Sequence, residues 1–386
     1  MLLSVAAGTM LVACAGGVLA KAGANPQPGA EGNGSDRYIV VLDNSVDHPL
    51  QVASGIEQHQ EDLDVGYVYD NALEGFSAEI PQEDLAAVRA NPQVDYVEPD
   101  GRVRALGVQT IPWGINRIDA DISSTMAGNG SGAVSNVNAY IIDTGIDRTH
   151  ADLNVVKHVN FTGGVNTDCD GHGTHVAGTV AARDDLGDVV GAAPGAPLTG
   201  VKVLGCNGSG WDSNIIKGID WVTANAKRPA VANMSLGGSA SKALDDAVRR
   251  SASKGIFYAL AAGNEGADAC TKSPARAGAG TNNGIMTVAA TDSSNREASF
   301  SNYGSCVDIW APGVGISSTR LGGGTTTMSG TSMASPHVAG GAALYLSRNI
   351  AATPSVVESQ LKTDAAATRT ASKDGAAIKL LYVGRY

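Results

Sequence analysis

The stretch NVNAYIIDTGID, residues 136–147, indicates the fold class of this chain. Its apolar run AYII (139–142) is followed by Asp143, just before a Thr-Gly turn. A short apolar run that ends at a turn is typical of a strand buried on both faces of a parallel sheet. Further runs of this kind follow along the chain: LTGVKVL (198–204), AVANMSL (230–236), IFYALAAGN (256–264) and GIMTVAA (284–290).

Helical stretches separate these runs: HVAGTVAA (175–182), SNIIKGIDWVTAN (213–225) and SKALDDAVRRSASKG (241–255). The alternation predicts an α/β fold with a central parallel β-sheet and helices on both faces. We expect this domain to span residues 106–386. Its functional groups should gather at the carboxyl ends of the strands.

A smaller unit precedes this domain in residues 36–105. Strands are predicted at YIVVL (38–42), GFSAEI (75–80) and VDYVEP (94–99), and helices at SGIEQHQEDL (54–63) and PQEDLAAVRANP (81–92). Pro81 suits the start of the second helix, and Pro92 ends it. The segment has β-α-β-β-α-β character and predicts a small α+β domain.

The charge of the chain is unevenly distributed. Residues 1–105 contain 5 basic and 16 acidic side chains, whereas residues 106–386 contain 22 of each. Nucleic-acid binding needs a basic face, so this balance argues against a nucleic-acid partner. It also suggests two units with separate evolutionary histories.

The first twenty residues, MLLSVAAGTMLVACAGGVLA, are apolar and rich in small side chains. They predict a signal peptide for export at 1–20, followed by a flexible linker at 21–35. The run from Leu11 to Cys14 resembles a bacterial lipobox, in which the cysteine is lipidated. A lipid anchor on Cys14 and an ordinary secretory signal both remain open, and either leads out of the cytoplasm.

Besides Cys14, the chain has four cysteines: Cys169, Cys206, Cys270 and Cys306. An even number in an exported chain favours two disulfides, for which three pairings are open. The spacing of the cysteines fits no zinc site.

The stretch SGTSMASPHVAG, residues 329–340, crowds hydroxyl groups before an apolar helix and contains a candidate nucleophile, Ser332. A serine hydroxyl needs a base to remove its proton and a third group to orient that base. His337 is near in sequence, but five helical positions rotate it by about 500° from Ser332, so the two side chains diverge. We therefore expect His337 to be a packed helix residue.

The base is expected from CDGHGTHVAG, residues 169–178, where His172 stands between two glycines at the start of a helix. A metal pair of His172 and His175 is the rival interpretation, although this spacing without an adjacent Glu is a weak zinc signal. Asp143, at the end of its buried strand, is the expected orienting carboxylate, because a charge there needs a partner. Asp147, past the turn, is the alternative.

The order Asp143, His172, Ser332 is that of subtilisin. YIIDTGID, GHGTHVAG and GTSMASPHVAG resemble the aspartate, histidine and serine motifs of the subtilase family of serine endopeptidases. WGINRID (113–119), RPAVANMSLGG (228–238), SPARAG (273–278) and SFSNYGSCVDIWAPG (299–313) resemble its proteinase K and aqualysin branch. The resemblance covers about 106–386, and residues 36–104 resemble the inhibitory propeptide of such enzymes.

This resemblance implies further site residues. Asn264 in AAGNEG would donate to the oxyanion, together with the backbone N–H of Ser332. Two backbone segments would hold the substrate as an added strand: Gly208, Ser209 and Gly210, and Ser235, Leu236 and Gly237. Recognition of the main chain implies broad specificity, and the small residues at these positions suggest a roomy apolar pocket.

The resemblance also implies structural calcium with Asp308 as one ligand, although the inserted segment AGAGTNN (277–283) precedes the region of the carbonyl ligands. It implies the disulfides Cys169–Cys206 and Cys270–Cys306. Asp170 departs from the family, where close relatives often have Asn. A carboxylate two residues from the base is expected to raise its pKa and shift activity toward alkaline pH.

These observations predict a secreted serine endopeptidase, made as a zymogen with residues 36–105 as its own inhibitor. Self-cleavage is expected near Ala105–Leu106. The partners would be protein and peptide substrates, the enzyme would be a monomer, and catalysis would need no cofactor. A metal-dependent hydrolase built on Asp170, His172 and His175 is the first alternative. A non-catalytic binding module on a protease scaffold is the second.

Overall fold

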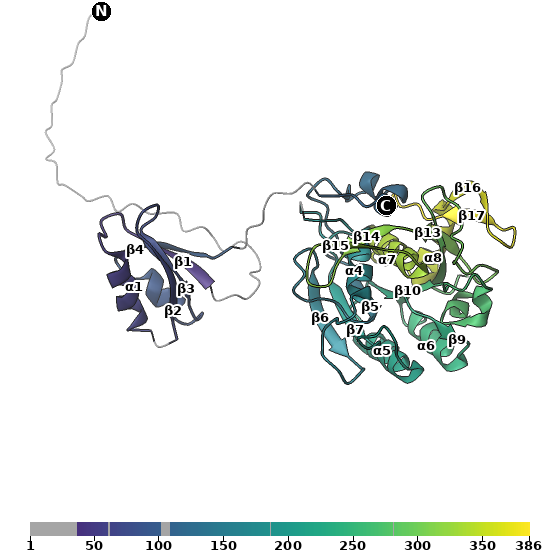
Figure 1. Cartoon of the computed structure of the whole chain (residues 1–386), viewed down its shortest axis with the longest axis horizontal. Helices are drawn as coiled ribbons and strands as arrows, with labels where there is room; N and C mark the ends of the chain where they lie inside the picture. Colours follow the sequence, from purple (N-terminus) through teal and green to yellow (C-terminus); the bar gives the residue numbers. More distant parts are fainter. Residues whose placement is uncertain (1–36, 61, 102–108, 186, 281) are drawn as a thin grey trace, which may run out of the picture. The chain divides into compact units, whose positions relative to one another are not determined.

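The computed structural model describes residues 37–386 except 61, 102–108, 186 and 281. The chain forms two compact units, Met1–Ala105 and Leu106–Tyr386, which are described separately (Figure 1). The expected signal peptide with Cys14, the linker and the Ala105–Leu106 bond lie outside the described residues. Among the described residues, no helix combines the length and apolar character needed to cross a membrane.

The small unit is a four-stranded antiparallel sheet with strand order β2-β3-β1-β4 and two helices. Its elements are β1 (Arg37–Leu42), α1 (Pro49–Glu57), β2 (Asp64–Tyr69), β3 (Gly75–Glu79), α2 (Leu85–Arg89) and β4 (Val94–Pro99). Inward-facing side chains of β1 and β3, such as Val40 and Phe76, form its core together with apolar residues of both helices. The α+β character expected for this unit is present.

Both helices of this unit differ from the expected ranges. The first begins earlier, at Pro49, because proline is well suited to the first turn of a helix, and it ends at Glu57. The second is confined to Leu85–Arg89. Before it, the N–H groups of Asp84 and Leu85 both donate to the carbonyl of Pro81, which closes a turn there.

The large unit contains a nine-stranded sheet with order β16-β17-β13-β12-β10-β8-β5-β7-β6. All neighbouring strands pair in parallel except the edge pair β16 and β17. The strands are β5 (Asn138–Asp143), β6 (Val155–Asn160), β7 (Leu198–Lys202), β8 (Ala230–Met234), β10 (Ile256–Ala261), β12 (Ile285–Thr291), β13 (Ile309–Pro312), β16 (Ala366–Ala371) and β17 (Ala377–Leu380). Each of the five strands expected from apolar runs is present in this sheet.

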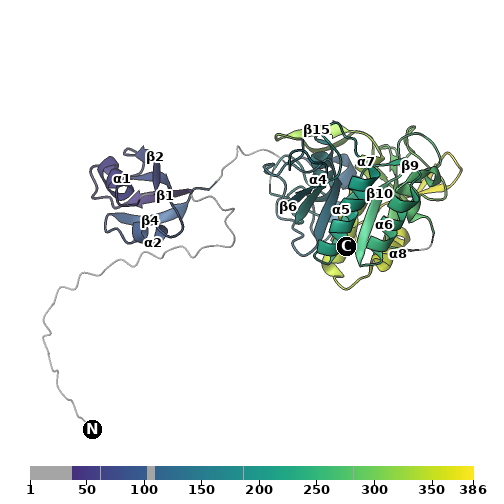
Figure 2. The same ribbon diagram turned by 90° about the horizontal axis from the view of Figure 1, so that it is seen from below.

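Helices cover both faces of the sheet. The helices α4 (His172–Ala181), α7 (Thr331–Arg348) and α8 (Pro354–Asp364) pack on one face, in the larger apolar core. The helices α5 (Asp212–Asn225) and α6 (Lys242–Ala252) lie side by side on the other face (Figure 2). This arrangement confirms the expected α/β fold class.

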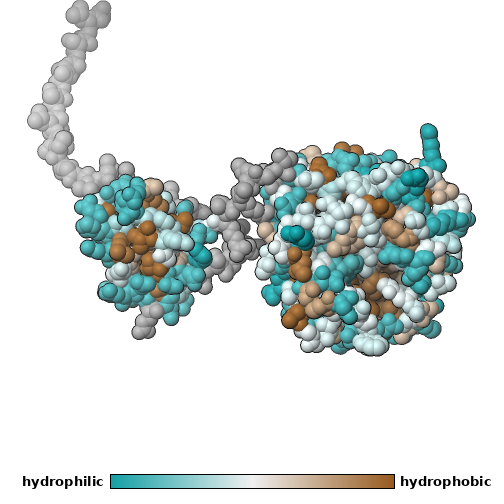
Figure 3. Space-filling model, viewed as in Figure 1, coloured by the Kyte–Doolittle hydropathy of each residue, from teal (hydrophilic) through white to brown (hydrophobic). Residues whose placement is uncertain are grey.

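Short helices complete the large unit: α3 (Trp113–Arg117) and the 3-10 helices η1 (Ala120–Ile122), η2 (Ala269–Thr271) and η3 (Ala275–Gly278). There are also two small two-stranded sheets. One pairs β9 (Gly238–Ser239) with β11 (Lys272–Ser273), and the other pairs β14 (Ile316–Thr319) with β15 (Thr325–Met328). The surfaces in view are mostly polar or neutral, with small apolar patches (Figure 3). The central strands β7, β8, β10, β12 and β13 are buried, whereas the edge strands β6 and β16 are partly exposed.

Candidate active site

The strand β5 ends at Asp143, whose side chain is fully buried. Nδ1 of His172 donates to Oδ1 of Asp143 at 2.7 Å, and the backbone N–H of Thr144 donates to the same oxygen at 2.7 Å. His172 is the first residue of α4, after Gly171 with φ +104°. A Cβ on Gly173 would lie 2.1 Å from the carbonyl oxygen of Gly145, so only glycine lets α4 approach the turn after β5 this closely.

Two opposing effects set the pKa of His172. Burial by itself lowers the pKa, but the adjacent Asp143 carboxylate, with smaller contributions from Asp170 and Asp168, raises the pKa to about 9. The hydrogen bond to Asp143 leaves Nε2 of the neutral ring free to accept a proton. In this arrangement the ring is oriented so that its Nε2 can accept a proton.

Ser332 lies in the first turn of α7 and is partly exposed. Its hydroxyl donates to the carbonyl of Ser235 at 3.2 Å, while the hydroxyl of Ser235 donates to the carbonyl of Ser332 at 2.7 Å. Asn233, near the end of β8, donates to Ser235 at 2.9 Å and accepts from Ser335 at 2.7 Å. This network ties the start of α7 to the end of β8.

Asn264 follows the end of β10 and is exposed. Its Oδ1 accepts from the backbone N–H of Thr331 at 2.8 Å and from the Thr331 hydroxyl at 2.9 Å. Because Oδ1 is held in this way, Nδ2 faces the other side. A Cβ built on Gly330 would lie 3.4 Å from Nδ2 of Asn264 and 3.6 Å from N of Ser332, so both donors border one small space.

Two pockets open beside these residues. A pocket of about 220 Å³ is lined by Asn264 and Ser332, and a pocket of about 370 Å³ is lined by His172. Both pockets share the segment from Ser235 to Gly238. His172 and Ser332, 160 positions apart in the sequence, therefore face neighbouring parts of one cleft. Gly208, Ser209 and Gly210 line the larger pocket.

The sequence of this chain matches two known protein families. Residues 135–379 match the subtilase family. This chain belongs to the subtilase family. Residues 37–106 of this subtilase match the peptidase inhibitor I9 family, which assigns the small unit to a propeptide inhibitor domain.

Similar proteins of known sequence and structure agree with this assignment. The subtilase is 47% identical over 356 residues to an extracellular serine proteinase of Thermus sp. strain Rt41A, covering 84% of this chain and 83% of the relative. It is 41% identical over 378 residues to alkaline serine exoprotease A of Vibrio alginolyticus, covering 90% of this chain and 67% of the relative. A crystal structure of a cold adapted subtilisin-like serine proteinase matches with a TM-score of 0.63 and 43% identity, covering 72% of this chain and 99% of that one.

The other histidines of these motifs lie elsewhere. His337 is fully buried in α7, and its Nδ1 lies 2.8 Å from the carbonyl of Met333. His175 is also fully buried, and its Nε2 lies 3.0 Å from the carbonyl of Ile316 rather than beside His172. Burial lowers the pKa of each ring to about 4. Among the described residues, no group of three His, Cys, Asp or Glu side chains is placed to hold a metal ion.

Asp147, the alternative carboxylate, has local partners. Its Oδ1 accepts from the backbone N–H and the hydroxyl of Thr149, and its Oδ2 accepts from the N–H of Gly322 at 2.9 Å. It is buried, although it lies past the turn that follows β5. Asp147 therefore shapes this loop, and Asp143 is the carboxylate that contacts His172.

Sequence reasoning overlooked Asp168, which is almost fully buried beneath the site. Its carboxylate accepts from the hydroxyls of Thr144 and Thr174 and from the N–H groups of Asp170, Gly171 and Thr174. Burial opposes ionisation, but these hydrogen bonds hold the pKa of Asp168 below its usual value. Asp168 thus ties the start of α4 to Thr144, the residue after Asp143.

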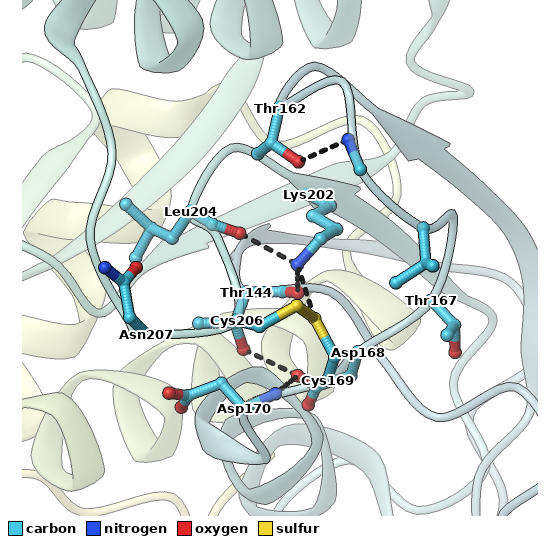
Figure 4. Close-up of a disulfide and its surroundings, with 12 residues drawn as sticks. Thr144, Thr162, Thr167, Asp168, Cys169, Asp170, Lys202, Leu204, Cys206 and Asn207 are labelled. Carbon is cyan, nitrogen blue, oxygen red and sulfur yellow. Dashed lines mark hydrogen bonds between the residues drawn. A yellow bond between two sulfur atoms is a disulfide. The ribbon is translucent and has the colours of Figure 1, made fainter.

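Lys202, at the end of β7, is also buried and was overlooked (Figure 4). Its ammonium donates to the carbonyls of Thr144 and Leu204 at 2.7 and 2.9 Å and to Sγ of Cys169 at 3.5 Å. Burial lowers the pKa of Lys202, although nearby carboxylates oppose this effect. No motif around Lys202 indicates that its ammonium binds the carbonyls of Thr144 and Leu204, so sequence reasoning could not identify it.

Two disulfides are present, Cys169–Cys206 and Cys270–Cys306. The first joins the segment just before His172 to the loop just before Gly208. It therefore connects the two sides of the larger pocket through a covalent bond.

The surroundings of Asp308 do not fit the calcium site that the resemblance implies. Oδ1 of Asp308 lies 2.6 Å from the ammonium of Lys362, and Oδ2 accepts from the N–H of Thr287 at 2.8 Å. Lys362 also contacts Glu358, whose other oxygen accepts from the N–H of Gly284. The Lys362 ammonium therefore lies between the two carboxylates, where it would repel a divalent cation. Asp308 is thus held in an ion pair with Lys362 here, and its role as a calcium ligand stays a prediction.

Proposed function

We propose that this subtilase is an endopeptidase that uses Asp143, His172 and Ser332 as a catalytic triad. The observation that carries the proposal is the oriented pair of Asp143 and His172, which opens onto the same cleft as Ser332. Ser332 Oγ attacks the peptide carbonyl, and Nε2 of His172 takes its proton and then gives it to the leaving amine. Water, activated by His172, hydrolyses the acyl-enzyme.

Negative charge develops on the carbonyl oxygen during each attack. We assign Nδ2 of Asn264 and the backbone N–H of Ser332 as donors to this oxygen, because both border the space next to Gly330. The Thr331 contacts hold the Asn264 amide in place before substrate arrives. Such preorganised donors stabilise the transition state more than the bound substrate. As a subtilase, the protein needs no cofactor for this chemistry.

Substrate binding is assigned to the two segments that line the cleft. A substrate in extended form would add as a strand between the two sides, with main-chain contacts supplying affinity. Such binding reads backbone rather than side chains and supports broad specificity. The segments are Gly208, Ser209 and Gly210, and Ser235, Leu236 and Gly237.

The I9 match supports a zymogen in which residues 36–105 act as an intramolecular inhibitor and residues 106–386 form the peptidase. We propose that the inhibitor is removed by cleavage near Ala105–Leu106. We propose that the enzyme is exported through the signal at 1–20 and acts outside the cytoplasm, since a relative from Thermus is an extracellular proteinase. We also propose that it acts as a monomer. Mass spectrometry of the mature protein reports both the cleavage point and any lipid on Cys14.

The proposal is tested by labelling with a serine-directed phosphonyl fluoride. The wild type should gain one label and lose activity, and Ser332→Ala should gain none and remain an unprocessed precursor. Ser329→Ala is the matched control, because Ser329 is exposed and its oxygen accepts from the N–H of Gly315. Labelling or maturation of pure Ser332→Ala contradicts the proposal.

A further inference from the structure

The larger pocket of the cleft has a distinctive charge pattern. Two of its lining side chains are carboxylates, Asp170 and Asp212, and none of the lining residues is Lys or Arg. Both carboxylates are exposed, and neither has an ion-pair partner in the part of the chain that the structure describes. His172, which also lines the pocket, must be neutral when it acts as a base. The pocket is therefore anionic in the active enzyme.

The rest of the pocket wall is apolar. Its lining includes Leu204, Ile215, Leu236 and Leu244. An apolar wall with carboxylates suits a side chain that has a long aliphatic stem and a cationic end. Lys and Arg have this form, since they bury their methylene groups and keep the charged end near water or an anion.

Asp170 is positioned close to the reacting groups. Its Oδ1 accepts from the backbone N–H of His172 at 3.2 Å. A Cβ on Gly208 would lie 3.4 Å from Oδ2 of Asp170, so this oxygen faces the loop on the other side of the pocket. The carboxylate points away from the Cys169–Cys206 disulfide (Figure 4). Asp170 thus borders the end of the pocket nearest His172.

Asp212 stands at the start of α5, which begins after Trp211. A carboxylate there also suits the positive end of the helix dipole, which is a purely structural explanation. Its position in the lining of the pocket distinguishes Asp212 from Asp220, further along the same helix, whose carboxylate pairs with Lys217 outside the pocket.

The register of an extended substrate decides which side chains enter this pocket. Side chains alternate between the two faces of a strand, so the second and fourth residues before the scissile bond share one face. The first residue would fill the pocket of Asn264 and Ser332, so the second and fourth would face the pocket of His172.

We propose that Asp170 and Asp212 give this enzyme a preference for Lys or Arg at the second and fourth residues before the cleaved bond. Asp170 recognises the second residue and Asp212 the fourth. The inference rests on the proposed peptidase activity and adds a charge preference to otherwise broad specificity. Both carboxylates act on the substrate by ion pairing rather than on the reacting bond.

Chromogenic tetrapeptides test this preference. Their first residue before the cleaved bond is kept constant, and Lys is compared with norleucine, its uncharged counterpart, at the second or the fourth position. At low salt, kcat/KM of the active wild type should be about five-fold higher for Lys at either position, as for an ion pair of ~1 kcal/mol. About 1 M NaCl should remove most of the difference, because it screens exposed charges.

Single substitutions show which carboxylate produces the Lys preference at each substrate position. Asp170→Asn should abolish the Lys preference at the second position and keep that at the fourth, and Asp212→Asn should do the reverse. Asp220→Asn, the matched control on α5, should retain both. The ratio of two peptides within one variant is used because Asp170 also affects the pKa of His172.

The outcomes distinguish the charge preference from the peptidase activity on which it depends. Equal rates for Lys and norleucine peptides in the wild type, or a preference that persists in both variants, overturn the inference and leave the peptidase proposal standing. Failure to hydrolyse any of the peptides, by a folded and processed enzyme, overturns the peptidase proposal and the inference with it.

Discussion

His172 and Asp143 form a hydrogen-bonded pair of 2.7 Å in which the carboxylate is fully buried and the imidazole is partly exposed. The pair joins the carboxyl end of β5 to the first residue of α4. Because the buried carboxylate favours the protonated ring, the pair determines the pH range in which His172 can act as a base.

The first prediction concerns this pH range. With the pKa of His172 raised to about 9, the base is mostly protonated at neutral pH. We expect kcat/KM for an uncharged peptide to rise with pH and to reach half of its plateau near pH 9. Asp143→Asn should lower kcat by about 10⁴, since the ring loses its orienting acceptor. A wild-type profile already flat from pH 6 to 10 contradicts this prediction.

A second prediction isolates the contribution of Asp170. Its negative charge helps to raise the pKa of His172, so Asp170→Asn should lower this pKa. The acid limb of the kcat/KM profile for an uncharged peptide should then move to lower pH. Asp220→Asn, on the surface of α5, is the control and should leave the limb in place. If the acid limb of the kcat/KM profile does not move in Asp170→Asn, Asp170 does not raise the pKa of His172.

A third prediction concerns Asn264. Replacement by alanine removes one donor to the developing oxyanion, so kcat should fall by about 10²–10³ with little change in KM. Labelling by phosphonyl fluoride should slow as well, while thermal unfolding followed by circular dichroism should stay close to that of the wild type. A raised KM with an unchanged kcat would instead make Asn264 a binding residue.

The sequence predicts the central strands of the large sheet. Apolar runs identify the buried central strands because both of their faces must be covered, as for β5 and β10. The same criterion overlooks β6, which reads VVKHVN and lies at the edge of the sheet with polar side chains exposed. Apolar content is thus a guide to the centre of the sheet only.

Residues that support the site could not be predicted in this way. Asp168 and Lys202 resemble ordinary surface residues in the sequence, and their importance arises from hydrogen bonds across several elements. The partner of Asp308 is Lys362, 54 positions further along the chain and on another element. Pairings of this kind depend on the packing of α8 against the sheet.

A fourth prediction tests Asp168 as a positioning residue. Asp168→Asn should lower kcat by weakening the link between α4 and Thr144, and should reduce the free energy of unfolding at pH 7 by about 2 kcal/mol or more. Because the folded-state pKa is depressed, ionisation of Asp168 stabilises the protein above pH ~4, and this stabilisation is lost as pH falls through the folded pKa. The stability difference between wild type and variant should shrink accordingly in acid.

The matched control for Asp168 is Asp184→Asn. Asp184 is a buried carboxylate that accepts from the N–H groups of Gly128, Gly130 and Gly132, away from the cleft. Its replacement should cost stability with little effect on kcat. Equal losses of kcat in both variants would show that Asp168 acts through general stability alone.

The final prediction concerns Lys362, which sits between Asp308 and the fully buried Glu358. Lys362→Met leaves two carboxylates without their cation, and breaking such a buried pair costs about 3–5 kcal/mol. Calcium should restore part of the loss in the variant, because two adjacent carboxylates are hard oxygen ligands for this ion. Thermal unfolding in EDTA and in CaCl₂ measures this: the gap in Tm between wild type and Lys362→Met should be wide in EDTA and narrower in CaCl₂. The exposed Lys217→Met is the control and should show no such gap. If the gap is the same in both solutions, these carboxylates do not form a cation site even without Lys362.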